Sequence, residues 1–311
     1  MVITLLWVLA LVAGLSVSAI ASGRALHAAQ SLGQRAGLSP FVIGLTIVAI
    51  GADLPEIANS ISAAYSGHGD LNVGDSTGSA ATQITLVLAL LCFMRPVRTE
   101  HGLVMVGGLS AVVALLVAAA VMGDGWISRS DGLLLVGGWI VSTGLIGFTT
   151  NVHASRQLTL FTRGAGRDLG AAIFALSIVA GGAVIVVMAF VAITEDLGVP
   201  EYITSFFVLS IGTSLPELLV DGRALREGSG SLALGGIVGS SLVDSTLSLG
   251  IGPALFPVAV SDKAASGTLV VAAIIAVALV ILISRRVHGW RSGVALLGVY
   301  AALYPLLLIV E

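Results

Sequence analysis

The side chains best suited to chemistry lie in two similar motifs whose glutamates, Glu56 and Glu217, are 161 residues apart. The first motif reads Gly-Ala-Asp-Leu-Pro-Glu over residues 51–56, and the second reads Gly-Thr-Ser-Leu-Pro-Glu over residues 212–217. Each motif is followed by a Gly-Ser pair and then by an acid or amide, which are Ser79 and Gln83 in the first copy and Ser240 and Asp244 in the second. Both copies lie in apolar segments, where an ionisable side chain is costly and therefore indicates a functional site.

Each Leu-Pro-Glu sequence would place backbone oxygen beside carboxylate oxygen. Proline has no N–H group, so Pro55 leaves the carbonyl of Gly51 without a helical partner, and Pro216 does the same to Gly212. In a bilayer such carbonyls are tolerated only when they are buried in protein or face a wet cavity. The serine and the acid or amide that follow each motif are four residues apart, so they share one face of a helix.

These groups together favour a site for a hard cation. Ca²⁺ takes about six to eight oxygen ligands, and carboxylate, amide, hydroxyl and carbonyl oxygens without histidine or cysteine suit Ca²⁺ or Na⁺. No lysine or arginine is expected at the bilayer midplane, which disfavours an anionic substrate. A structural alternative is that Leu-Pro-Glu only kinks two helices whose glutamates pair with polar neighbours, but its occurrence twice at one offset argues against this.

The composition places these motifs in a polytopic membrane protein. Apolar residues make up 57% of the 311 residues and charged residues 10%, and the mean hydropathy is +1.06. A soluble domain of this size would not tolerate such a surface. The single cysteine, Cys92, excludes an intramolecular disulfide and a cysteine metal cluster.

Ten segments are long and apolar enough to cross a bilayer as helices of about 20 residues. They lie near residues 2–22, 38–65, 73–94, 102–122, 132–150, 169–193, 202–222, 232–256, 266–284 and 292–310. The first segment has small residues that would suit signal-peptide cleavage, but it lacks a preceding basic region and is long for a signal peptide. We therefore expect it to be a span.

The arginines predict the orientation of these spans, because basic residues in short loops mark the cytoplasmic side. The odd-numbered loops contain Arg24, Arg35, Arg95, Arg98, Arg156, Arg163, Arg167, Arg223, Arg226, Arg285, Arg286 and Arg291. The even-numbered loops contain only Arg129 and Lys263 of the basic residues, together with Asp70, Asp124, Asp131, Glu195, Asp196, Glu201 and Asp262. This alternation predicts that both termini are extracytoplasmic.

The predicted fold is an all-α integral membrane protein with ten transmembrane helices in two inverted five-helix repeats, of which the second and seventh helices are broken. The first repeat covers residues 1–150 with its motif over 44–85, and the second covers 169–311 with its motif over 205–248. Residues 151–168 form a cytoplasmic connector. Because five is odd, the second repeat would enter the membrane in the opposite orientation and bring both glutamates to the bilayer midplane.

The doubled motif resembles the alpha repeats of the calcium/cation antiporter superfamily, in particular prokaryotic sodium/calcium exchangers. The resemblance covers both repeats and implies a sodium-driven calcium antiporter in which Glu56 and Glu217 are shared ligands of the central ion sites. It also implies ligand positions at Ser79, Ser240, Asp244, Thr213 and Ser214.

The chain departs from that family pattern mostly in the first repeat. Ala52-Asp53 stands where the family usually has Thr-Ser, and Asp75 and Gln83 stand where it has asparagine. In the second repeat Gly236 also replaces an asparagine. Ala52 could still act as a ligand if its backbone carbonyl coordinates the ion.

The departures add carboxylates to the predicted site, which would contain Asp53, Glu56, Asp75, Glu217 and Asp244. Neighbouring carboxylates titrate as a coupled cluster, so the cluster could carry an extra proton at neutral pH. Alternatively, Asp53 and Asp75 pair with each other, or Asp75 caps the start of the third span. Asp221 adjoins Arg223, so we expect it to be solvated or ion-paired. The histidines fall in loops or at span ends without metal-ligand spacing.

We expect a secondary active cation antiporter of the cell membrane that exchanges sodium for calcium by alternating access, and not an enzyme. Within that class, proton coupling to calcium or another divalent cation is the alternative. A passive cation channel and an intramembrane hydrolase with two carboxylates are the alternatives of other classes, disfavoured by the broken inverted repeats and by the close helix packing. The expected partners are inorganic cations and the lipid bilayer, with no cofactor, no nucleic acid and no obligatory protein partner.

Overall fold

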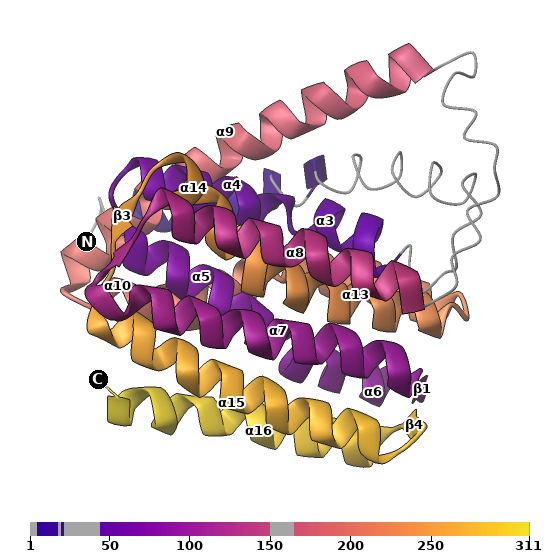
Figure 1. Cartoon of the computed structure of the whole chain (residues 1–311). Coiled ribbons are helices and arrows are strands. Elements are labelled where there is room, and N and C mark those ends of the chain that lie inside the picture. The colour runs from indigo at the N-terminus through magenta and orange to yellow at the C-terminus, as the bar shows by residue number, and fades with distance from the viewer. Residues whose placement is uncertain (1–4, 18–19, 22–43, 150–164, 311) are drawn as a thin grey trace.

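Figure 1 shows the computed structural model, which describes residues 5–17, 20–21, 44–149 and 165–310. The predicted first span, the start of the second span and most of the connector over 151–168 lie partly or wholly outside the described residues. The described part is mostly helical, as predicted, and its strands are only two residues long.

The first described residues form an apolar helix over Leu5–Val17. The elements that follow are η1 (Gly44–Val48), α3 (Ala49–Ala52), α4 (Leu54–Tyr65), α5 (Gly69–Thr82), η2 (Gln83–Val87), α6 (Leu88–Met94), β1 (Val97–Arg98), α7 (His101–Val121), η3 (Met122–Asp124), β2 (Trp126–Ile127) and α8 (Arg129–Thr149). Of these, η1 and η2 are single π-helical turns and η3 is a 3-10 turn.

The later part of the chain repeats this order after a long helix, α9 (Ala165–Leu197). Its elements are α10 (Glu201–Thr204), η4 (Ser205–Leu209), α11 (Ser210–Thr213), α12 (Leu215–Arg226), α13 (Gly230–Val243), η5 (Asp244–Ser248), α14 (Leu249–Leu255), β3 (Val258–Ala259), α15 (Asp262–Ser284), β4 (Val287–His288) and α16 (Trp290–Val310). Here η4 and η5 are again π-helical turns.

The two halves match element by element. Except for the 3-10 turn η3, every helix and strand from η1 to α8 has a counterpart that begins 161 residues later in the chain, which is also the separation of the two motifs. The contacts repeat as well. β1 pairs with β4 and β2 pairs with β3, both in antiparallel fashion. Since β3 is the counterpart of β1 and β4 is the counterpart of β2, the two strand pairs are equivalent. The halves therefore pack against each other as two equivalent units.

Both motif helices are interrupted at the residue before Leu-Pro-Glu. Asp53 lies between α3 and α4 with φ −80° and ψ 9°, and Ser214 lies between α11 and α12 with φ −79° and ψ 1°. Proline occupies the first turn of the helix that follows in each case, where its missing N–H group is tolerated. The predicted breaks in the motif helices are therefore present.

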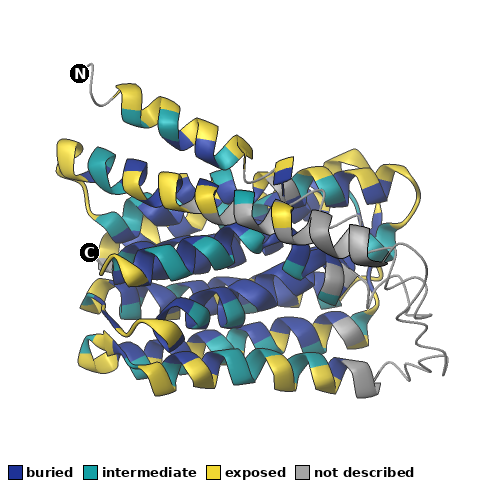
Figure 2. Ribbon diagram, turned by 90° about the horizontal axis from the view of Figure 1, so that it is seen from above, coloured by how far each residue is buried: buried dark blue, intermediate teal, exposed yellow. Residues whose placement is uncertain are grey.

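Helices α5 and α13 form the centre of the bundle. In the most apolar 18-residue stretch of Gly69–Met94, which joins α5, η2 and α6, 78% of the residues are buried, and in that of Gly230–Leu255, which joins α13, η5 and α14, 89% are buried. In the peripheral helix Trp290–Ile309 only 28% of the most apolar 18-residue stretch is buried, and apolar side chains such as Leu306 and Ile309 point outward. Figure 2 shows the buried residues gathered on the inner helices.

Six helices among the described residues are long and apolar enough to cross a membrane. They are Gly69–Met94, Val104–Asp124, Glu201–Arg226, Gly230–Leu255, Asp262–Ser284 and Trp290–Ile309. They correspond to six of the ten predicted spans. The spans predicted over 2–22, 38–65, 132–150 and 169–193 remain predictions.

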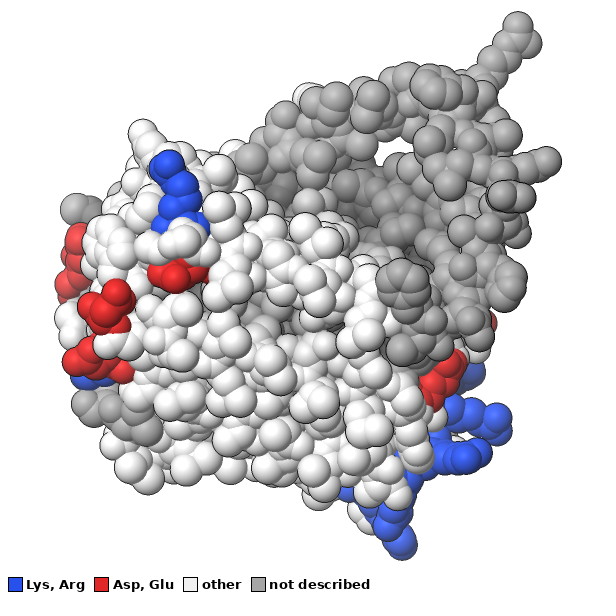
Figure 3. All heavy atoms as spheres, viewed as in Figure 1, with Lys and Arg blue, Asp and Glu red and all other residues white. Residues whose placement is uncertain are grey.

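Charged side chains gather at the two ends of the helices. Figure 3 shows arginines mainly at the end that carries β1 and β4, and acids mainly at the other end. Arg98 and Arg286 flank that first strand pair, whereas Asp124 and Asp262 lie beside β2 and β3. We call the first end the arginine-bearing end, and the belt between the ends is apolar, as a membrane protein requires.

Two equivalent glycines allow the central helices to touch the π-turns of the opposite half. A Cβ atom at Gly78 of α5 would lie 2.5 Å from the backbone oxygen of Phe206 in η4. A Cβ atom at Gly239 of α13 would likewise overlap the backbone oxygen of Leu45 in η1. A backbone atom cannot move aside as a side chain can, so these positions require glycine.

We predict that Gly78→Ala and Gly239→Ala each destabilise the protein by about 1–3 kcal/mol, as overpacking does. Thermal unfolding of the detergent-purified protein would measure the change. Gly137→Ala is the matched control, because a Cβ atom there would meet nothing within 4 Å. Unchanged melting temperatures for both central variants would contradict the close helix contact.

Candidate cation-binding site

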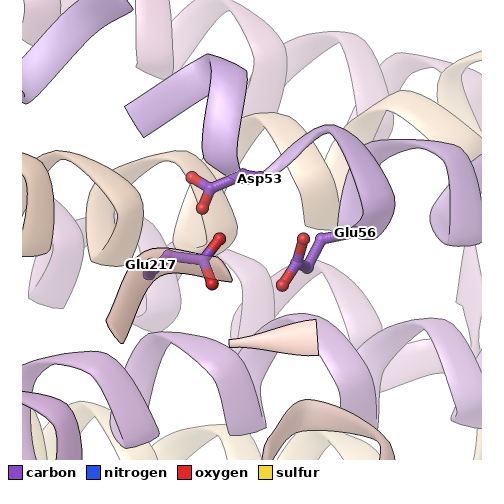
Figure 4. A group of neighbouring side chains, drawn as sticks. All are labelled: Asp53, Glu56 and Glu217. Atoms are coloured by element: carbon purple, nitrogen blue, oxygen red, sulfur yellow. The ribbon is translucent and has the colours of Figure 1, made fainter. Parts of the chain in front are cut away.

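Three carboxylates from the two interrupted helices meet in the centre of the bundle. Asp53 and Glu56 come from the first motif and Glu217 from the second, and one oxygen of each lies within 4.8 Å of the others. Their exposed fractions are 0%, 1% and 1%. Figure 4 shows the three carboxylates pointing toward one another. Because the two glutamates belong to different halves, this cluster exists only when the halves pack together.

The cluster has no protein group beside it, within the described part of the chain, that would compensate a negative charge. None of the six carboxylate oxygens has a hydrogen-bond partner among the described residues, and no ion pair there reaches them. Buried charges are normally paired or bound to a metal ion. Oxygens at this separation can converge on one cation, so the donor set suits a hard cation such as Ca²⁺ or Na⁺.

The facing helices add polar groups around Asp53. Its carboxylate lies next to the side chains of Gln83, Ser240 and Glu217. Asp244 lies next to Gln83 and interacts electrostatically with Asp53. All of these residues are buried. The carboxylates of the first motif therefore meet oxygen-bearing side chains of both central helices.

The acid and the amide predicted on these helices occupy equivalent backbone positions. Gln83 is the first residue of η2, and Asp244 is the first residue of η5. Single π-helical turns within α-helices occur frequently at functional sites. The sequence predicted both residues from their spacing, whereas the π-turn that carries each of them appears only in the structure.

Asp75 belongs to a hydrogen-bonded group beside the cluster. Asn59 Nδ2 donates to Asp75 Oδ2 at 3.1 Å, and Thr213 Oγ1 donates to Asp75 Oδ1 at 3.3 Å. Ser79 Oγ and Thr213 Oγ1 are 3.2 Å apart. The group joins α4, α5 and α11, so it links the two halves through a carboxylate whose oxygens both have partners.

This geometry corrects two expectations for the first repeat. Asp75 does not cap the third span, because α5 begins at Gly69 and places Asp75 in the helix interior. Asp75 also does not pair with Asp53, since its partners are Asn59 and Thr213. Asn59 was missed by the sequence analysis, although its position three residues after Glu56 on the same helix was a signal.

The remaining predicted site residues are buried near the breaks. Ala52 is the last residue of α3 and is 3% exposed, and Ser214 lies in the break of the second motif helix with a buried Oγ that lacks a partner among the described residues. Asp221 corrects another expectation. It is 2% exposed, and no ion pair reaches it within the described part, so it is neither solvated nor ion-paired there.

The comparisons with known proteins agree with this geometry. The model of the sodium/calcium exchanger protein family matches residues 6–148 and 168–309. The chain belongs to this family. The two matched regions contain both motifs and leave out most of the predicted connector.

Two relatives extend over most of the chain. Inner membrane protein YrbG of Escherichia coli is 29% identical over 92% of this chain and 91% of its own length. Sodium/calcium exchanger MaX1 of Methanosarcina acetivorans is 25% identical over 89% of this chain and 91% of its own length. The similarity of this family member to its relatives is therefore not confined to one repeat.

A solved structure has the same fold. The sodium-calcium exchanger NCX_Mj, soaked with Na⁺ and Sr²⁺, aligns with a TM-score of 0.67 at 25% identity, covering 98% of this chain and 99% of that chain. The family member described here therefore shares its helix arrangement with an exchanger whose crystals were soaked with a monovalent and a divalent cation.

We predict that calcium stabilises the purified wild-type protein against thermal unfolding and that Glu56→Gln or Glu217→Gln removes this effect. Calcium at one hundred times its dissociation constant would contribute about 2.7 kcal/mol through binding to the folded state. Melting temperatures with and without calcium would measure it. Exposed Glu227→Gln is the matched control, and equal stabilisation of all four proteins would show that calcium binds elsewhere.

For Asp75 we predict a mainly structural effect. Asp75→Ala removes both acceptor oxygens and leaves the buried Nδ2 of Asn59 without its partner, at a cost of about 1–3 kcal/mol. We expect a lower melting temperature but an undiminished increase on adding calcium. Loss of the calcium effect with an unchanged melting temperature would instead make Asp75 a ligand.

Proposed function

We propose that this protein is a secondary active antiporter that exchanges Na⁺ for Ca²⁺ across the cell membrane by alternating access. The observation that carries the proposal is the buried cluster of Asp53, Glu56 and Glu217, which is assembled from the interrupted helices of two equivalent halves. Membership of the sodium/calcium exchanger family and the name of the relative MaX1 support the same choice of ions.

The proposed architecture has ten transmembrane helices in two inverted five-helix repeats, residues 1–150 and 169–311, joined by the cytoplasmic connector 151–168. Two observations support the repeats: equivalent elements are separated by a constant number of residues, and the pair β1–β4 is equivalent to the pair β3–β2. An odd number of spans in each repeat inverts the second. The arginines beside β1 and β4 support a cytoplasmic location for that end, which places both termini outside.

In the proposed site, Glu56 and Glu217 bind the divalent ion directly and are shared with sodium when it replaces calcium. Asp244 and Gln83 complete the ring of ligands from the facing helices, and Asp53 adds a third central carboxylate. Further oxygens come from Ser79, Ser240, Thr213, Ser214 and the backbone of Ala52, while Asp75 holds Thr213 and Ser79 in place.

Exchange follows from competition for the same oxygens. The empty cluster contains like charges in a dry interior, so a conformational change that closes it is unfavourable until cations compensate the charge. One Ca²⁺ or two Na⁺ offset two of the three negative charges, and a proton on the third carboxylate would offset the last. Since both ions require the same carboxylates, binding of one excludes the other, and each passage across the membrane carries one kind of ion.

A second candidate within this class is proton-coupled transport of calcium or another divalent cation. The observation that favours it is Asp53, a buried carboxylate in contact with the glutamate cluster at a position where the family pattern has serine. Carboxylates this close titrate as a group, so a proton can replace a metal cation as the compensating charge.

We predict that purified protein in lipid vesicles takes up radioactive calcium when an outward sodium gradient is imposed. Glu56→Gln and Glu217→Gln should each reduce the initial rate at least a hundredfold, because each removes a direct ligand charge. Glu227→Gln should keep the wild-type rate. Uptake driven only by an outward proton gradient would show that protons, and not sodium ions, are the coupling ion. No uptake under either gradient would refute calcium antiport.

A further inference from the structure

Asp221 is a buried carboxylate for which the proposed exchange mechanism has no role so far. It follows Glu217 by four residues on α12, is 2% exposed, and its Oδ1 has no hydrogen-bond partner among the described residues. Arg223, the nearest arginine in the sequence, binds Glu227 instead, with Nε 2.8 Å from Oε1. The carboxylate of Asp221 is therefore inside the protein, and no basic side chain of the described residues forms an ion pair with it.

A missing side chain on the neighbouring helix makes room for this carboxylate. A Cβ atom at Gly236 of α13 would overlap Asp221 Oδ1, and it would lie only 2.9 Å from Cγ and 3.0 Å from Oδ2. The carboxylate of Asp221 therefore lies directly against the backbone of α13. Any side chain at Gly236 would displace it.

The other half of the molecule has the opposite arrangement at the equivalent positions. The motif offset relates Asp221 to Ser60 and Gly236 to Asp75. Each half thus places one carboxylate between its two equivalent helices, from α5 in the first half and from α12 in the second. The carboxylates differ in their surroundings, because Asp75 has a partner for each oxygen whereas Asp221 Oδ1 has none. Only the second half therefore offers a free buried oxygen here.

The position of Asp221 connects the central cluster with one end of the protein. Four residues of helix separate it from Glu217 by about 6 Å along α12. It interacts electrostatically with Asp53 of the cluster. Beyond it, the last turn of α12 contains Arg223 and Arg226, so Asp221 lies between the cluster and the arginine-bearing end.

We propose that Asp221, held in the space above Gly236, is an additional hard-cation binding residue on the route between the central carboxylates and the arginine-bearing end. This inference rests on the proposed exchange function. A cation that leaves Glu217 toward this end would meet a second carboxylate, which compensates its charge before it reaches the arginines. The first half lacks a free equivalent, so this step exists on only one side of the membrane.

The test uses right-side-out and inside-out membrane vesicles that contain the full chain, with calcium uptake driven by sodium from either face. Asp221→Asn keeps the size of the side chain and removes its charge. We expect the calcium concentration for half-maximal uptake to rise about tenfold when calcium is added at the arginine-bearing face, and to stay unchanged from the opposite face. Gly236→Ala should have the same one-sided effect, because it displaces Asp221.

Two controls make the result specific. Glu227→Gln removes one carboxylate from the same helix end outside the proposed route and should leave both faces unchanged. Labelling of Ser229→Cys with a membrane-impermeant reagent identifies the arginine-bearing face, since Ser229 is exposed and the native Cys92 is buried.

An equal change from both faces, or no change from either, would overturn the role of Asp221 while leaving exchange itself intact. A wild-type protein that moves no calcium in either vesicle type would instead overturn the proposed function, and the role of Asp221 with it.

Discussion

The central constraint on this molecule is the burial of several carboxylates in a bundle of apolar helices, where no basic side chain of the described residues pairs with them. Asp53, Glu56 and Glu217 share one small volume, and the hydrogen bonds of the described residues do not compensate them. A bundle of apolar helices can keep such groups only if cations or protons compensate them. The surrounding structure, with its breaks, π-turns and close helix contacts, positions oxygen atoms for those cations.

The repeated architecture is a physical solution to this requirement. Two interrupted helices of opposite halves each present a glutamate at the break, and two central helices pack against them through Gly78 and Gly239. Gly78 and Gly239 are equivalent positions of the two halves, and so are the residues that they contact. Each half therefore presents the same contact surface to the other. Transporters built from two such repeats achieve alternating access largely by rocking one part against the other around a fixed site.

The two halves are equivalent in backbone but not in charge. Asp53 is matched by Ser214, and Asp75 by Gly236, while Asp221 is matched by Ser60. The first half thus has an extra central carboxylate and a carboxylate with two partners, and the second half has a carboxylate with a free oxygen. These differences are confined to side chains, so they can tune ion preference on each side of the membrane while the shared scaffold stays unchanged.

The sequence by itself determined the class of protein, the doubled motif, the helix breaks at the prolines and most candidate ligands. These follow from local chemistry: apolar segments of spanning length, proline without an N–H group, and carboxylates that an apolar segment would not otherwise contain. The identity of Glu56 and Glu217 as partners in one site was accessible because a constant offset relates equivalent positions.

Only the tertiary structure decided which carboxylates converge and which are held apart. From the sequence Asp75 could be a ligand, a helix cap or a partner of Asp53, and Asp221 was expected to be solvated or ion-paired. In the structure α5 begins earlier than hydropathy indicates, and Gly236 opens a space for Asp221 inside the bundle. Hydropathy reports how apolar a segment is and not which neighbour lies across from each residue. Whether a buried carboxylate meets a hydrogen-bond partner or an unfilled space depends on the packing of helices that are distant in the chain.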